Sequence, residues 1–274
     1  MGWSKMKVYI SCDMEGISGV VSSEQTHMGD KEYERARKLM TEEANAAIEG
    51  ALVGGAREIV VNDAHGEGRN ILIEGLNPQA QLISGWPRPW GMMQGIDGTF
   101  DAVFFIGYHA QAGTKDSVIA HTVSGRIYQV RLNGEPIGET GLNAALAGYF
   151  GVPVVLVTGD RLLAEEAKVL LGSSLETVIV KEGYGTRAAK CLSPQRAQQL
   201  IREAAERALE RGGEPFSLSP PLTLTVDFAR GVQSEMAELI PGVVRLEGRR
   251  VEYTDDDYLT VYKVFRAMNS LVAQ

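Results

Sequence analysis

Two carboxylates stand close together where an apolar run ends, near the start of the sequence. Asp13 and Glu15 lie in the stretch SCDMEG, which directly follows KVYI. In an extended segment, side chains two residues apart point to the same side, so these carboxylates converge. Like charges that close repel each other unless they are protonated, solvated or shared by a cation. The glycine that follows them, Gly16, allows the backbone to fold tightly around a bound group.

Three further groups occupy similar places along the chain. His65 follows the apolar stretch REIVVND, His109 ends DAVFFIGYH, and Glu139 stands where a predicted hairpin passes into a predicted helix. In open parallel sheets, ligands collect beyond the carboxyl ends of the strands, so loops distant in sequence meet there. We therefore expect the two imidazoles and Glu139 to meet the carboxylate pair at one edge of a sheet.

The charges of these five residues indicate what they hold. Three carboxylates and two neutral imidazoles over-supply a single divalent ion, whereas two divalent ions and one shared hydroxide bring the cluster to neutrality, with Asp13 placed to bridge. Mixed imidazole and carboxylate ligands favour zinc over calcium or magnesium, with manganese and cobalt as alternatives. The sequence therefore predicts two Zn²⁺ per chain.

Other residues near these motifs have ordinary structural interpretations. A single Asp at a strand end most often forms a turn or caps a helix, and a single His in a loop is usually solvated. Asp63 could orient an imidazole or, equally, cap the loop HGEGRN that follows it. We expect His27, within the polar stretch SSEQTHMGD, at the surface, and Cys12 packed in the core, facing away from the carboxylates.

The composition is that of a soluble globular protein. The chain has 274 residues, 44% of them hydrophobic, which is enough to bury a full α/β core. A net charge of −8 opposes binding to nucleic acid or to an anionic membrane, because both partners would repel the protein. Two cysteines, the lack of a signal-peptide pattern and the lack of an apolar run of ~20 residues lead us to expect a cytoplasmic location.

Strand and helix patterns alternate over the first two thirds of the sequence. Apolar runs predict buried strands, with helical stretches separating most of them, at 6–13, 57–63, 80–85, 101–108 and 152–160. Helical spacing of apolar residues predicts helices over 31–53 and from 139. Alternation about Asn133 and Gly134 predicts a hairpin.

The last third has a different pattern. After CLSP at 191–194 come an amphipathic helix, a strand at 222–228, a hairpin around EGRR and a terminal helix from Asp255. We therefore expect an α/β domain over residues 1–188, with a mainly parallel sheet flanked by helices. A smaller α+β lobe is expected over 189–274, and it is our candidate for oligomerisation.

Together the motifs resemble those of the DppA-type zinc-dependent D-aminopeptidase family. SCDMEG is similar to that family's Ser-x-Asp-x-Glu-Gly signature, and VNDAHG, GYHA, HTV and GETGLNAALAGYFGVPV follow in the family's order. The resemblance spans nearly the whole chain. It implies a cytoplasmic, zinc-dependent exopeptidase that removes N-terminal D-amino acids and assembles as a homodecameric ring.

The resemblance also implies roles for individual residues. Asp13 would bridge two zinc ions, His121 would be catalytic, and the shells would be completed by Glu15, His65, His109 and Glu139. An imidazole has a pKa near neutrality, so we expect His121 to shuttle the proton; a nucleophilic or oxyanion-stabilising role is the competing assignment.

The expected function is hydrolysis of N-terminal D-amino acids, of the D-Ala type, from short peptides or amino-acid amides by a dinuclear zinc site with a bridging water. The residues alone do not fix the D preference, which comes from the resemblance. Two other functions stay open. One is a dinuclear hydrolase of another amide or of a phosphoester, although no basic cluster accompanies the ligands. The other is a non-catalytic, metal-stabilised binding protein, which would not need His121.

Overall fold

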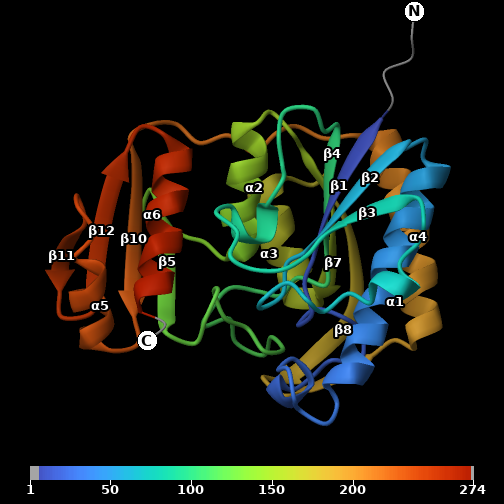
Figure 1. Ribbon diagram of the computed structural model, residues 1–274, viewed down its shortest axis with the longest axis horizontal. Helices are drawn as coiled ribbons and strands as arrows, with labels where there is room; N and C mark the ends of the chain where they lie inside the picture. The colour runs from blue at the N-terminus through green and yellow to red at the C-terminus, as the bar shows by residue number, and fades with distance from the viewer. Residues whose placement is uncertain (1–5, 273–274) are drawn as a thin grey trace, which may run out of the picture.

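Two β-sheets organise the part of the chain that the computed structural model describes, residues 6–272 (Figure 1). Within these residues, one sheet has seven strands in the order β3-β2-β1-β4-β7-β8-β9, and the other has five in the order β11-β12-β10-β5-β6. Neighbouring strands of the larger sheet are parallel except for the final antiparallel pair, β8 and β9. The smaller sheet is antiparallel throughout.

The strands at the centre of the larger sheet are buried, and those at its edges are partly exposed. Their bounds are β1 Lys7–Cys12, β2 Glu58–Asp63, β3 Ala80–Ile83, β4 Ala102–Ile106, β7 Val154–Asp160, β8 Glu176–Gly185 and β9 Ala188–Cys191. The central strands β1, β4 and β7 are rich in β-branched and aromatic residues, which suit a sheet covered on both faces.

Helices cover both faces of the larger sheet (Figure 1). α1 (Tyr33–Val53) and α4 (Pro194–Arg211) pack together on one face, and α2 (Glu139–Tyr149) and α3 (Arg161–Leu171) lie on the other. α4 begins after Ser193, whose side chain accepts a hydrogen bond from the Arg196 amide, and it ends at Gly212. Alternate residues of β4 point into the two layers, so Phe104 packs toward α1 and Phe105 toward α2.

The smaller sheet packs beside the α2 and α3 layer (Figure 1). Its elements are β5 Ile127–Leu132, β6 Glu135–Pro136, β10 Leu222–Phe228, α5 Gly231–Ala237, β11 Val244–Glu247, β12 Arg250–Asp255 and α6 Tyr258–Leu271. α6 lies against α2, where the Tyr258 hydroxyl donates a hydrogen bond to the Leu142 carbonyl over 2.7 Å. The two sheets therefore share one continuous apolar core.

The expected α/β class, with a mainly parallel sheet and additional antiparallel structure, is confirmed. The expectation that helices separate most of the early strands is wrong. β2 and β3 are joined through a short 3₁₀ helix, Ile73–Gly75, and β3 and β4 through another, Gly91–Met93. Both connections contain prolines, such as Pro78 and Pro87, which lack the amide hydrogen that a longer helix needs.

The hairpin expected about Asn133 forms, with φ values of 53° at Asn133 and 86° at Gly134. It joins the smaller sheet, however, because β5 pairs with β10. Conversely, β9 and α4 belong with the larger sheet. Elements thus cross the proposed boundary between 1–188 and 189–274 in both directions, and that division stays a prediction.

Among residues 6–272, no helix combines the length and the apolar character needed to cross a lipid bilayer.

Candidate metal centre

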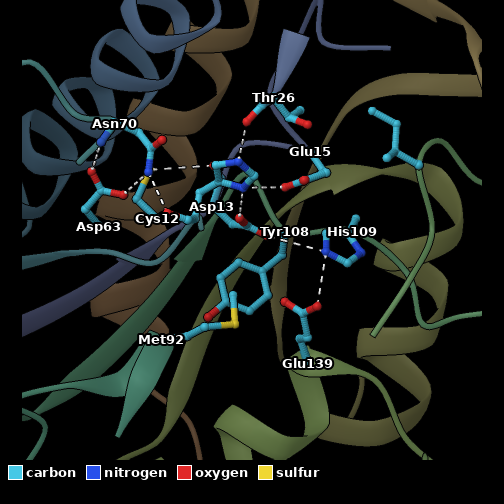
Figure 2. Close-up of polar contacts among 12 residues, drawn as sticks. Cys12, Asp13, Glu15, Thr26, Asp63, Asn70, Met92, Tyr108, His109 and Glu139 are labelled. Carbon is cyan, nitrogen blue, oxygen red and sulfur yellow. Dashed lines mark hydrogen bonds and ion pairs between the residues drawn. The ribbon is translucent and has the colours of Figure 1, made fainter. Parts of the chain in front are cut away.

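The register of the larger sheet brings three loops to one edge. Cys12, the last residue of β1, pairs with Asp63 on one side and with Ile106 on the other, so β1, β2 and β4 end level with each other. The loops that carry Asp13, His65 and His109 therefore leave the sheet from the same edge. Figure 2 shows Asp13, Glu15, His109 and Glu139 converging there.

Two glycines allow the first and third of these loops to touch. A Cβ atom on Gly16 would lie 1.8 Å from the Tyr108 carbonyl oxygen, and one on Gly107 would lie 2.3 Å from the Asp13 carbonyl oxygen. The backbones are joined instead by two hydrogen bonds, from the Asp13 amide to the Ile106 carbonyl (2.8 Å) and from the Gly16 amide to the Gly107 carbonyl (2.7 Å). Only glycine permits this approach of one backbone to another.

Asp13, Glu15 and His65 form a first group of side chains with the donor atoms of a metal site. Nε2 of His65 lies 2.8 Å from the Thr26 carbonyl oxygen, so this nitrogen carries the hydrogen and Nδ1 keeps its lone pair. Nδ1 lies 3.2 Å from Oδ1 of Asp13 and 2.9 Å from Oε2 of Glu15. A lone pair facing two anionic oxygens is unfavourable unless a proton or a metal ion lies between them.

A second group with the donor atoms of a metal site consists of His109, His121 and Glu139. Nδ1 of His109 donates to the Ala110 carbonyl (3.0 Å), and Nδ1 of His121 donates to the Ile119 carbonyl (2.9 Å). Their Nε2 atoms face Oε1 of Glu139 at 3.4 and 3.8 Å, respectively. The two rings are stacked with centroids 4.1 Å apart. Each imidazole of the centre thus has one nitrogen held by a carbonyl and the other free for a metal, the usual arrangement of metal-binding histidines.

Asp13 belongs to both groups. Its Oδ1 faces His65, while its Oδ2 lies 3.4 Å from Nε2 of His109. The residue is only 3% exposed. A single buried carboxylate therefore offers one oxygen to each group, which is the geometry required of a bridging ligand.

The pKa values of Asp13 and His109 are both raised, which means that the cluster is stabilised by added positive charge. Burial, reinforced by the neighbouring Glu15, raises the pKa of Asp13 to about 6. Burial opposes the charged form of His109, but Glu139 and Asp13 outweigh it and raise the pKa of His109 to about 10. Without a metal ion, protons on the imidazoles supply the missing positive charge, so metal binding must displace them.

Two buried atoms support a metal rather than a purely hydrogen-bonded cluster. Among the described residues, Oε2 of Glu15 and Nε2 of His109 have no hydrogen-bond partner. The close approach of Glu15 to His65 thus lacks hydrogen-bond geometry. Unsatisfied buried polar atoms are rare in folded proteins, and both atoms here are of the kind that binds zinc. The residues present therefore fit a pair of divalent transition-metal ions.

His121 differs from the other histidines of the cluster in exposure and in backbone strain. Its side chain is 27% exposed, against 2% for His109 and 14% for His65. On either side of it, Ile119 and Val123 have φ values of 51° and 63°, a region that β-branched residues rarely adopt. The Ile119 carbonyl holds His121, and the Val123 amide donates to Glu139 over 2.5 Å. The strained backbone is thus tied to the site itself.

Asp160 supports this strained loop, although no motif in the sequence marks it as part of the site. Its Oδ2 accepts hydrogen bonds from the Ser117 hydroxyl (2.6 Å) and the Val118 amide (2.9 Å). Its Oδ1 accepts from the Leu163 amide (2.8 Å) and so caps α3. The detectable signal was an Asp directly before a helix, which predicts a cap but not a contact with Ser117, 43 residues earlier in the chain.

The structure brings together all six residues singled out from the sequence: Asp13, Glu15, His65, His109, His121 and Glu139. Of the two interpretations of Asp63, the cap is the one observed: its carboxylate accepts hydrogen bonds from the Asn70 and Ile71 amides at 2.6 and 2.7 Å (Figure 2). As expected, His27 is exposed and Cys12 is packed in the core on the α1 side.

Known proteins match the chain over almost its whole length. The profile of a family described as D-aminopeptidase matches residues 6–267. A D-aminopeptidase of Bacillus subtilis (strain 168) is 40% identical over 269 residues, which cover 97% of each chain. The solved structure described as Zn-dependent D-aminopeptidase DppA from Bacillus subtilis, a self-compartmentalizing protease, superposes with a TM-score of 0.95 at 38% identity and covers 98% of each chain.

The two oxygens of the Asp160 carboxylate accept hydrogen bonds from different elements, so the contact with the loop that carries His121 can be tested separately from the cap of α3. In Asp160→Asn, the amide oxygen can still cap α3, whereas the new NH₂ group faces the Val118 amide and cannot accept its hydrogen. Since a hydrogen bond to a charged acceptor contributes about 1.5–3 kcal/mol, we expect exchange at 117–121 to accelerate on the order of ten- to a hundredfold. Hydrogen exchange followed by mass spectrometry measures this, with peptides from α3 as the internal control. Equal acceleration in α3 would mean that Asp160 serves the helix alone.

Proposed function

Because the chain belongs to the D-aminopeptidase family, we propose that its six clustered residues form a two-zinc centre that releases N-terminal D-amino acids, of the D-Ala type, from short peptides or amides. The observation that carries this proposal is the position of Asp13, with one oxygen toward each group. The zinc requirement stated for the Bacillus subtilis structure agrees with the mixture of imidazole and carboxylate donors found here.

The proposed ligands divide according to the two groups. Glu15 and His65 would hold one ion, His109 and Glu139 the other, and Asp13 would bridge them. When bound, two such ions activate a water molecule and polarise the scissile carbonyl. Glu139 is the first residue of α2, where the helix dipole favours a negative charge, so its carboxylate is kept ready to bind a cation.

His121 is the proposed proton shuttle. Its Nδ1 is occupied by the Ile119 carbonyl, which leaves Nε2 as the basic atom on the side of Glu139. The partial exposure of the ring lets Nε2 reach a water molecule or a substrate, unlike the buried ring of His109. In this role Nε2 accepts a proton from the attacking water and returns it to the leaving amine. A direct nucleophilic role is the competing assignment.

The family match favours this function over the two alternatives from the sequence. A phosphoester hydrolase or a non-catalytic binding protein could use the same ligands. The matching relatives, however, are described as D-aminopeptidases, and the match covers 97–98% of their length. The substrates proposed are therefore short peptides and amino-acid amides.

We further propose that the protein forms a homo-oligomer, and specifically a decameric ring. The structural relative is described as self-compartmentalizing, and the two chains cover each other almost completely. The edge strand β11 exposes Val244 and Leu246, at 56% and 50%, and thus provides an apolar surface for contact. We also propose a cytoplasmic location, which the free thiols of Cys12 and Cys191 support.

Metal content tests the ligand assignment residue by residue. We expect about two zinc ions per chain in the wild type, fewer than one in Asp13→Ala, about one in Glu15→Ala and about two in His121→Ala, because a bridging ligand serves both ions and a proton shuttle serves neither. Equilibrium dialysis with elemental analysis gives these numbers. All three variants, and the chelated wild type, should lose hydrolysis.

Glu42→Ala is the matched control for metal content, since it removes an exposed carboxylate on α1 and should leave both ions in place. Equal metal loss in Asp13→Ala and Glu15→Ala would contradict the bridging role. Loss of an ion in His121→Ala would make that residue a ligand rather than the shuttle.

The stereochemical preference is tested with mirror-image substrates. If the scissile carbonyl and the free amine are both fixed, the side chain has one permitted direction, and a carbonyl misplaced by about 1 Å reacts on the order of a hundredfold more slowly. We therefore expect kcat/KM for D-alanine p-nitroanilide to exceed that for the L-form by on the order of a hundredfold on the zinc-loaded enzyme. Faster turnover of the L-form would leave a metallopeptidase but overturn the D assignment.

Assembly is tested in solution. Because the family resemblance implies a closed decameric ring, we expect one sharp species of about ten chains at micromolar concentration. Sedimentation velocity with multi-angle light scattering measures its mass. A monomer would rule out the ring. The variant Val244→Glu should weaken the assembly if β11 contributes to the contact, whereas Val169→Glu, on exposed α3 surface, is the control.

A further inference from the structure

A buried lysine donates hydrogen bonds to the turn that carries Glu15. Lys181 lies in β8, and only 2% of the residue is exposed. Its ammonium group donates hydrogen bonds to the main-chain carbonyls of Glu15, Ile17 (3.1 Å) and Val20 (2.5 Å). A lysine ammonium has three N–H donors, so all three are used by one turn of the chain, residues 15–20.

The protonated state of Lys181 follows from this arrangement. A neutral amine has only two N–H groups and could not satisfy three carbonyls. The three carbonyl contacts therefore require the charged ammonium form, and Lys181 is an internal cation beside the first group.

Two other elements hold the same turn. The Ser18 amide donates to Oε1 of Glu43, on α1, over 2.8 Å, and the Ser18 hydroxyl donates to the Leu192 carbonyl over 2.8 Å. Glu43 is itself 2% exposed. The turn 15–20 is thus fixed from β8, from α1 and from the segment after β9, although it contains no regular secondary structure of its own.

We propose that Lys181 is a positioning residue for the first metal ion: by holding the carbonyls of the turn 15–20, it fixes the direction of the Glu15 carboxylate and so sets the zinc affinity of the first group. This inference rests on the proposed two-zinc function. Cβ and the main-chain carbonyl carbon of Glu15 are bonded to the same Cα. Fixing the carbonyl therefore fixes the direction of the Cα–Cβ bond, from which the carboxylate extends. The second group has no such contact with Lys181 and should be unaffected.

Lys181→Met removes the donors while nearly keeping the length and volume of the side chain. We expect one of the two zinc affinities to fall on the order of ten- to a hundredfold, the usual effect of losing a residue that orients a ligand, with the other affinity unchanged within about twofold. Competition with a chromophoric chelator on the purified protein measures both constants. Lys190→Met is the matched control, because Lys190 on β9 is largely exposed and makes only a surface ion pair with Glu182.

A double-mutant cycle separates positioning from general destabilisation. If Lys181 acts through Glu15, then Lys181→Met combined with Glu15→Ala should bind zinc no more weakly than Glu15→Ala alone. Additive losses, or equal weakening of both ions in Lys181→Met, would overturn the proposal. Lys181→Gln, which keeps two N–H donors, should give an intermediate loss and decides the question should the Met variant fail to fold.

The same measurements keep this inference distinct from the proposed function. A wild-type protein that binds two zinc ions but cleaves no D-aminoacyl amide would refute the function, whereas the affinities of the Lys181 variants would still decide the positioning role. A wild-type protein that binds no zinc would refute both.

Discussion

The repulsion among buried carboxylates is the constraint on which the rest of the site depends. Asp13 and Glu15 are almost fully buried beside each other, and Oε1 of Glu139 lies 3.4 Å from Nε2 of His109. Burying a charge is costly unless it is paired, so this cluster is stable only with positive charge inside it. The main-chain carbonyls of Thr26, Ala110 and Ile119 hold the hydrogens of the three imidazoles on the outside. The other nitrogen of each imidazole then faces the carboxylates, where it can carry a proton or bind a metal ion.

Several unusual backbone features lie next to this cluster of side chains. Gly16 and Gly107 bring two loops into direct backbone contact, and the loop around His121 contains β-branched residues at positive φ. The positive φ values at Ile119 and Val123 would be destabilising by themselves. The loop around His121 is held in place by hydrogen bonds that the buried Asp160 carboxylate accepts from the Ser117 hydroxyl and the Val118 amide, and the level ends of three parallel strands bring the two glycine loops together. The strands therefore fix the positions of the side chains in both groups, while the less regular loop carries His121, the most exposed histidine of the cluster.

Much of this could be predicted from the sequence, for reasons that differ between residues. Asp13, His65 and His109 follow apolar strands, and the rule that ligands gather at the carboxyl ends of such strands was sufficient to group them. The carbonyl partners could not be predicted, because every residue has a carbonyl and its side chain does not indicate which one will be used. Lys181 is 166 residues from Glu15, and nothing in its neighbourhood distinguishes it from a surface lysine. The hairpin at 127–136 was recognised from its turn, but its sheet was not, since pairing partners are set by tertiary packing.

That hairpin has a consequence for how the enzyme is made. It lies in the chain between His109 and Glu139, and its strand β5 pairs with β10, so that Leu132 lies opposite Leu224. During synthesis on the ribosome, the hairpin has no sheet to join until residues 222–228 have emerged. Pairing between segments this far apart in sequence has a larger loop-closure entropy cost than local pairing. Until that pairing forms, the chain that joins His109 to Glu139 is not tied to the smaller sheet, so we expect the second group to reach its final arrangement only after residue 228 has been synthesised.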